Sequence, residues 1–236
     1  MSKYLSFGLF LFGVVTFMFV LMNYTAVGEY NEDIIYLTKE HIVLVGVSGA
    51  LAVVAGIFFG VMLSRPMFDK QAENIMQIFN ISVTVPTLAV LALSMSFLGI
   101  GFLPSIIGLF IATLLPIIKN SFVGLKAVNP HMIEAAKGMG MSPVQILLHV
   151  EIPNAMFVIF SGIRTALAIN VGTAPLVFLI GGGGLGELIF SGIDLDMMPM
   201  LLAGAVTTGV LAILVDKVTY LISTVVISKG VFPEDE

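Results

Sequence analysis

Long apolar runs recur along this chain, and each approaches the roughly 20 residues that a helix needs to cross the hydrocarbon core of a membrane. Only 11% of the residues are charged and 58% are hydrophobic, whereas a soluble globular domain carries about 25% charged residues. Because lipid offers the backbone no hydrogen-bond partners, such continuous runs are expected to be helical. The sequence therefore predicts an all-α membrane protein with about six transmembrane helices, at residues 5–22, 41–63, 76–98, 103–118, 156–180 and 199–227.

The first run follows Lys3, as the apolar part of a cleaved secretion signal would. No small-residue cleavage site follows it, since Asn23-Tyr24-Thr25-Ala26 is a poor candidate. We therefore expect a retained helix. The predicted organisation is an N-terminal helix with an acidic outer loop at residues 1–40, a core domain at 41–227 and a tail at 228–236.

Positive charge predicts the orientation, since lysine and arginine gather in the cytoplasmic segments of membrane proteins. If the N-terminus is cytoplasmic, only Lys39 falls outside, in the acidic loop. The cytoplasmic segments and their edges then hold Lys3, Arg65, Lys70, Lys119, Lys126, Lys137 and Lys229. Both termini and the polar segment 119–155 are therefore predicted to be cytoplasmic.

Several classes of function are unsupported by the residues present. A net charge of −5 without any basic block argues against a nucleic-acid partner. The chain has no cysteine, and its three histidines, His41, His131 and His149, are not at metal-ligand spacing. We expect no metal, no cofactor and no catalytic site in this chain.

A glycine-rich stretch near residue 183 fits the pattern G-x-G-x-x-G through Gly181, Gly183 and Gly186. That pattern indicates dinucleotide binding only between a strand and a helix of a soluble βαβ unit. Here it joins two apolar runs, so we expect an outer turn, where non-helical backbone is tolerated if protein buries it.

The segment 119–155 is predicted to hold two short helices. Asn129 followed by Pro130 is a typical N-cap with proline at the first helical position. That helix is expected to stop at Gly138 or Gly140, where glycine tolerates positive φ.

The second short helix is expected to begin at Ser142, because Ser142 and Gln145 have the spacing of a capping box. It is expected to end before Pro153, since the residue that precedes a proline avoids the helical region. Two short helices joined by a tight glycine turn form a compact knob.

The same segment carries Glu134-Ala135-Ala136, then Gly140, and then Val150, Ile152 and Pro153. This spacing resembles the EAA loop of ABC-importer permeases. The resemblance implies the type I ABC-importer permease fold with a cytoplasmic coupling-helix loop. It also implies docking of an ATPase subunit on Glu134, Ala135, Ala136, Gly140 and Pro153. A loop that packs only on its own membrane domain is the alternative.

Further stretches resemble the permeases of osmoprotectant importers, which take up glycine betaine, choline, carnitine or related quaternary amines. They are residues 85–89, 97–102, 115–120, 133–141, 161–166 and 180–193. The resemblance implies a bacterial plasma-membrane location, ABC ATPase subunits, an extracytoplasmic substrate-binding protein and a second permease subunit in a homo- or heterodimer. The N-terminal helix and residues 23–40 lie outside it.

Two other kinds of transporter compete with this interpretation. Permeases of methionine or other amino-acid importers share the EAA loop and a similar glycine-rich turn. An ion-coupled secondary transporter would place acids at mid-membrane, but the predicted helices hold only Asp216, near one end.

Polar residues inside the predicted helices need a reason, because an unpaired amide is costly there. Asn170 and Thr173 line the translocation path in one interpretation, whereas a helix-packing hydrogen bond of Asn170 is the alternative. Arg164 is expected to extend to the cytoplasmic interface, and Asp216 with Lys217 is expected to be interfacial.

Acidic residues follow the glycine-rich stretch, at Glu187, Asp194 and Asp196. They are predicted to lie at the outer mouth, where they either meet the binding protein and attract a cationic cargo or belong to an ordinary solvated loop.

Overall fold

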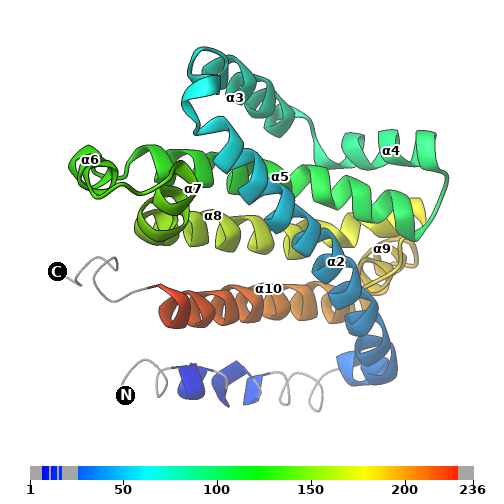
Figure 1. Ribbon diagram of the computed structural model, residues 1–236. Helices are drawn as coiled ribbons and strands as arrows, with labels where there is room; N and C mark the ends of the chain where they lie inside the picture. Colours follow the sequence, from blue (N-terminus) through cyan, green and yellow to red (C-terminus); the bar gives the residue numbers. More distant parts are fainter. Residues whose placement is uncertain (1–6, 11, 15, 18–25, 228–236) are drawn as a thin grey trace.

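The computed structural model describes residues 7–10, 12–14, 16–17 and 26–227. Every regular element in these residues is helical (Figure 1). The α-helices are α2 (Asn31–Leu63), α3 (Asp69–Thr84), α4 (Thr87–Leu98), α5 (Phe102–Lys126), α6 (Pro130–Gly138), α7 (Pro143–Ile146), α8 (Ile152–Thr173), α9 (Gly186–Asp194) and α10 (Met198–Val226). Two 3-10 turns flank α2, at Ala26–Tyr30 and Pro66–Phe68; a third, Ala174–Ile180, extends α8, and a π turn, Leu147–Glu151, precedes α8.

Four stretches of the described residues are long and apolar enough to cross a membrane, at Gly28–Leu63, Phe102–Lys126, Pro143–Ile180 and Met198–Val226. They confirm four of the predicted helices, of which the first three are longer than predicted and the fourth is shifted by one residue. The first predicted helix, 5–22, lies partly outside the described residues. Its described pieces are helical and run beside α10 (Figure 1), where the Lys217 ammonium lies 5.6 Å from the Phe10 ring centroid.

The predicted helix at 76–98 is wrong as a single element, because the chain breaks between α3 and α4. Pro86 adopts φ −56° and ψ 134°, which is extended backbone. A proline has no N–H to donate and disfavours the helical region for the residue before it. The result is a polar α3 and a short apolar α4 that packs along α5.

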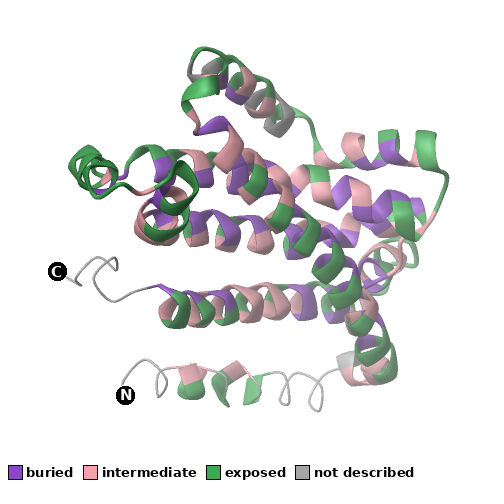
Figure 2. Cartoon of the chain, in the orientation of Figure 1, coloured by how far each residue is buried: buried purple, intermediate pink, exposed green. Residues whose placement is uncertain are grey.

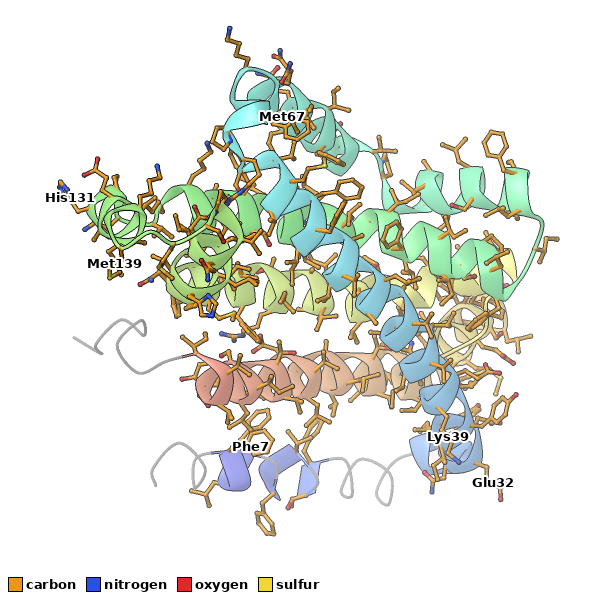
Figure 3. All side chains as sticks on the ribbon, in the orientation of Figure 1. Phe7, Glu32, Lys39, Met67, His131 and Met139 are labelled. Carbon is orange, nitrogen blue, oxygen red and sulfur yellow. The ribbon has the colours of Figure 1, made fainter. Side chains whose placement is uncertain are left out.

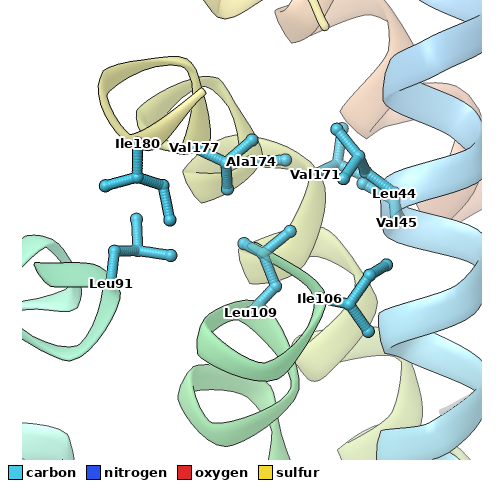
Figure 4. Close-up of a cluster of buried hydrophobic side chains, with 9 residues drawn as sticks. All are labelled: Leu44, Val45, Leu91, Ile106, Leu109, Val171, Ala174, Val177 and Ile180. Atoms are coloured by element: carbon cyan, nitrogen blue, oxygen red, sulfur yellow. The ribbon is translucent and has the colours of Figure 1, made fainter. Parts of the chain in front are cut away.

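Helices α2, α5 and α8 pack against one another at the centre of the bundle, and α10 packs on α8 and α9. Figure 2 shows buried residues concentrated along α5 and α8, whereas α6 is almost wholly exposed. One buried cluster joins α2, α4, α5 and the end of α8 (Figure 4): Leu44, Val45, Leu91, Ile106, Leu109, Val171, Ala174, Val177 and Ile180.

Glycines allow α2 to approach α5 closely. A Cβ added at Gly56 would lie 2.6 Å from the Cβ of Ile117, which is fully buried, and a Cβ at Gly60 would overlap Ser121. Because glycine has no side chain, the backbone of α2 lies close to that of α5, and many dispersion contacts form where the two helices cross.

The glycine-rich stretch forms the predicted turn between two helices. Gly181, Gly183 and Gly184 all have φ of 77°, a region that favours glycine. The turn folds back on α2, where the N–H of Gly184 donates to the Glu40 carboxylate at 3.1 Å. These glycines therefore shape a turn that docks on α2.

Gly56→Leu is expected to destabilise the bundle, because overpacking costs about 1–3 kcal/mol or more where the neighbour cannot move. Thermal unfolding in detergent should show a lower Tm. Gly46→Leu is the matched control, since Gly46 lies on the same helix with no atom within 4 Å of an added Cβ. Equal Tm values for the two variants would contradict this account of the α2–α5 crossing.

Candidate functional site

The segment 129–151, here called the α6–α7 segment, protrudes from one end of the bundle, far from α9 (Figure 1). Its first helix starts as predicted. The Asn129 side chain accepts a hydrogen bond from the N–H of His131 at 3.0 Å, and Pro130 occupies the first turn. A capped start fixes the direction in which α6 leaves α5.

The end of α6 is a Schellman motif. The N–H of Met141 donates to the carbonyl of Ala136 at 3.1 Å, and the N–H of Gly140 donates to the carbonyl of Lys137 at 2.9 Å. Gly140 has φ 80°, which this motif requires at that position. No atom lies within 4 Å of a Cβ added at Gly140, so its requirement is conformational.

The start of α7 is the predicted capping box. The N–H of Ser142 donates to the Gln145 side-chain carbonyl at 2.8 Å, and the N–H of Gln145 donates to the Ser142 hydroxyl at 3.3 Å. Both ends of the linker between α6 and α7 are therefore fixed by hydrogen bonds.

The predicted end of the second helix before Pro153 is wrong. Helix α7 passes into the π turn and then into α8, and Pro153 lies in the first turn of α8. The N–H of Ile152 donates to the carbonyl of Leu147, one residue further back than in an α-helix. The wider turn accommodates a proline that has no N–H and whose ring crowds the preceding turn. The chain therefore runs from α7 into the bundle without a loop.

The surface of the α6–α7 segment mixes charge with apolar groups. Glu134 and Ala135 are exposed, whereas Ala136 is buried. Glu134 lies 3.8 Å from the His131 ring nitrogen in an exposed pair. Figure 3 places His131 and Met139 at the tip of the segment. Four large apolar side chains are exposed there: Met132 at 43%, Met139 at 75%, Val144 at 63% and Leu148 at 54%.

An ion pair that the sequence reasoning missed ties this segment to α2. The guanidinium of Arg65 lies 2.6 Å from the Glu151 carboxylate, and the two side chains are 30% and 11% exposed. Arg65 also donates to the Ser64 hydroxyl at 2.8 Å and to the carbonyl of Val61 at 3.2 Å. The end of α2 and the π turn are thus joined by charge.

Deep in the bundle, Asn170 forms the helix-packing hydrogen bond. It is fully buried, and its amide donates to the Ser48 hydroxyl at 2.9 Å. Its side chain therefore does not face a cavity in this conformation. Thr173 is half-buried and donates to the carbonyl of Ile169 at 2.9 Å.

The predicted extension of Arg164 to the cytoplasmic interface stays a prediction, and the structure shows the partner of Arg164 within the protein. Arg164 binds Asp216 of α10 through its Nε at 3.0 Å and one Nη at 2.8 and 3.0 Å. Its guanidinium lies 5.0 Å from the Tyr220 ring centroid. Asp216 is therefore the partner of Arg164 between α8 and α10, and its predicted interfacial position stays a prediction. Sequence spacing alone gave no sign of this pair, since the two residues are far apart in the chain.

The predicted outer-mouth residues Glu187, Asp194 and Asp196 are all exposed and lie on or next to α9. Asp196 has φ 55°. No group of three or more metal-ligating side chains occurs among the described residues.

Residues 52–229 match the family described as the inner membrane component of binding-protein-dependent transport systems. The chain belongs to this family. It is a multi-pass membrane protein and a transport permease subunit.

The permease resembles curated relatives over most of its length. It is 52% identical over 184 residues to the osmoprotectant import permease protein OsmY of Salmonella typhimurium, with 78% of each chain covered. It is 40% identical over 186 residues to the choline transport system permease protein OpuBB of Bacillus subtilis, which covers 79% of this chain and 85% of that relative. Against the glycine betaine/carnitine/choline permease protein OpuCB of Bacillus subtilis, identity is 37% over 198 residues, with 84% and 90% covered.

Two solved structures share the fold. A chain of the MetNI methionine ABC transporter in an inward-facing conformation superposes with a TM-score of 0.73 at 22% identity, covering 83% of this chain and 96% of that one. An amino acid ABC transporter with histidines gives a TM-score of 0.67 at 18% identity, with 84% and 96% covered. The predicted type I ABC-importer permease fold is confirmed.

Glu151→Gln should destabilise the permease by removing the partner of Arg65. Breaking a buried pair costs about 3–5 kcal/mol, and the partial exposure of Arg65 lowers the expected coupling to about 1–2 kcal/mol. A double-mutant cycle with Arg65→Gln, read from thermal unfolding, measures that coupling. The control is the same cycle on the exposed pair His131 and Glu134, where no measurable coupling is expected. A coupling near zero at Glu151 would contradict the structural role of this pair.

Proposed function

We propose that this permease is the translocation subunit of an ATP-driven importer for small osmoprotectants of the glycine betaine, choline and carnitine type. The observation that carries the proposal is the 52% identity over 184 residues with an osmoprotectant import permease. Relatives at 37–40% identity bear the names of choline and glycine betaine/carnitine/choline permeases. The methionine transporter shares the fold at 22% identity, so an amino-acid cargo has weaker support.

The α6–α7 segment is the proposed docking site for the ATPase. Its exposed apolar side chains lie among exposed polar residues on a segment that protrudes from the bundle (Figure 1). An exposed apolar patch with a polar rim is typical of a protein interface. Caps at Asn129, Gly140 and Ser142 make the segment rigid. A rigid segment moves as one body when its partner moves.

Two connections would carry that motion into the membrane. Helix α7 continues through the π turn into α8, and the Arg65–Glu151 ion pair joins the same turn to α2. A displacement of the docked segment therefore reaches α2 and α8 together. Binding of a partner shifts the conformational balance only through such differential contacts.

The remaining proposed partners are matched to exposed surfaces at other places on the molecule. An apolar groove of about 600 Å³ between α4 and α5, with Phe97, Leu98 and Ile111 on its wall, suits a second permease subunit, in a homo- or heterodimer. The exposed acids Glu187 and Asp194 suit an extracytoplasmic binding protein. No enzymatic step is assigned to this chain.

The proposed orientation places both termini and the α6–α7 segment in the cytoplasm of a bacterial cell, with α9 outside, because the segment carries Lys137 and adjoins Lys126. The chain has no cysteine, so single cysteines at Glu32 and at His131, both exposed, can be probed with a membrane-impermeant thiol reagent. Labelling at position 32 and not at 131 in intact cells is expected. The reverse pattern would overturn the orientation.

Met139→Ser should weaken ATPase docking. An exposed apolar side chain that is buried in an interface contributes about 1–2 kcal/mol, roughly ten-fold in Kd. Met198→Ser is the matched control, because Met198 is 62% exposed at the opposite end of the bundle. Co-purification of the ATPase and its hydrolysis rate with the permease give the readout. If Met139→Ser leaves the co-purification and the hydrolysis rate of the ATPase unchanged while Met198→Ser lowers them, the docking site lies elsewhere.

The proposed cargo predicts growth rescue at high salt by glycine betaine, choline or carnitine in cells that carry this permease with its partner subunits. Uptake of radiolabelled osmolyte and of radiolabelled methionine should be measured side by side. ATP-dependent osmolyte uptake is expected, with no methionine uptake. Methionine uptake without osmolyte uptake would refute the cargo and leave the permease assignment intact.

A further inference from the structure

The ion pair between Arg164 and Asp216 joins two charged groups within helices that are long and apolar enough to cross a membrane. At about 1.5 Å per residue, Arg164 is about 18 Å along α8 from Ile152, and Asp216 is about 15 Å from the end of α10 at Val226. Both residues therefore lie within the long apolar stretches Pro143–Ile180 and Met198–Val226, away from the ends of their helices. The pair is held in place by its bidentate geometry and by the Tyr220 ring beneath the guanidinium.

The pair is also accessible. The side chains of Arg164 and Asp216 are 34% and 31% exposed. They open into a pocket of about 430 Å³ whose other walls are Ser161, Thr165, Ala168 and Ile169. Ionised groups within a membrane-spanning helix seldom face lipid, and such residues mark substrate pathways. We therefore expect the open side of the pocket to face water or protein.

We propose that Arg164 and Asp216 form a transient binding site for a zwitterionic quaternary-amine carboxylate, such as glycine betaine, on the translocation path. The guanidinium of Arg164 binds the carboxylate of the cargo, and the carboxylate of Asp216 faces its cationic nitrogen. Tyr220 positions the guanidinium. The site rests on the proposed function, since it assumes that the permease carries such a cargo.

Charge balance explains why a zwitterion suits this pocket. When a zwitterion enters between the two side chains, each ionised group exchanges one opposite charge for another, so no charge is left unpaired in a medium of low dielectric constant. A cation without a carboxylate, such as choline, leaves Arg164 without a new partner and is repelled by it. The pair therefore favours glycine betaine over choline.

A purely structural role is the alternative, in which the pair only fastens α8 to α10. The two roles predict different outcomes for Arg164→Gln. A structural role lowers stability and gives no difference between zwitterion and cation. The binding role lowers affinity for the zwitterion and leaves that for the cation unchanged or higher.

The deciding experiment is saturation-transfer NMR of glycine betaine and of choline on the full-length permease in lipid nanodiscs. Wild type should bind glycine betaine more tightly than choline, and Arg164→Gln should weaken glycine betaine binding by about ten-fold or more. Lys217→Gln is the matched control, because Lys217 is the cation next to Asp216 in α10 and faces Phe10 instead. It should leave both affinities unchanged.

Arg164→Lys serves if Arg164→Gln does not fold, since lysine keeps the charge but loses the bidentate fork. It should weaken glycine betaine binding and spare choline. Equal effects of the variant on glycine betaine and choline binding would overturn the site. So would the absence of a glycine betaine signal with wild type at up to about 50 mM, which corresponds to a binding free energy weaker than about 2 kcal/mol. Uptake assays report separately on the proposed function, because a permease that imports osmolyte with no such site refutes this inference alone.

Discussion

The structure depends on one constraint: a polar group inside the membrane must find its hydrogen bonds within the protein. Hydroxyls in the helices donate to carbonyls one turn back, as Thr113 does to Leu109 and Thr208 to Gly204. Other polar contacts among the described residues join different helices, and two of them pair side chains: Asn170 with Ser48 and Arg164 with Asp216. The first is wholly buried and fixes helix packing, whereas the second is open to a pocket and is the one to which we assign a ligand.

Prolines show the same constraint acting on the backbone. At Pro86 the helix stops and restarts, which leaves α4 too short to cross the membrane by itself. At Pro153 the helix continues, because a π turn widens the ladder by one residue immediately before it. The π turn before Pro153 joins α7 to α8 without a loop, and it therefore links the α6–α7 segment to the bundle.

Local features of this chain were predictable from its sequence, and contacts between distant residues were not. The caps at Asn129 and Ser142 and the glycine stop of α6 depend on side chains within a few residues of the backbone they satisfy. The Arg65–Glu151 and Arg164–Asp216 pairs depend on how helices cross, which no local pattern encodes. The helix ends at Pro86 but continues at Pro153. The missing N–H of a proline is therefore predictable from the sequence, whereas the response of the helix is not.

The central claim is that the α6–α7 segment is the surface through which the ATPase acts on the membrane helices. Hydrogen–deuterium exchange on the permease alone and in complex with its ATPase tests this directly, because exchange reports local opening and burial of backbone amides. The account predicts added protection of amides in residues 130–151 when the ATPase binds, with the amides of α9 unchanged. Unchanged exchange in residues 130–151, together with new protection in α3 or elsewhere, would contradict it.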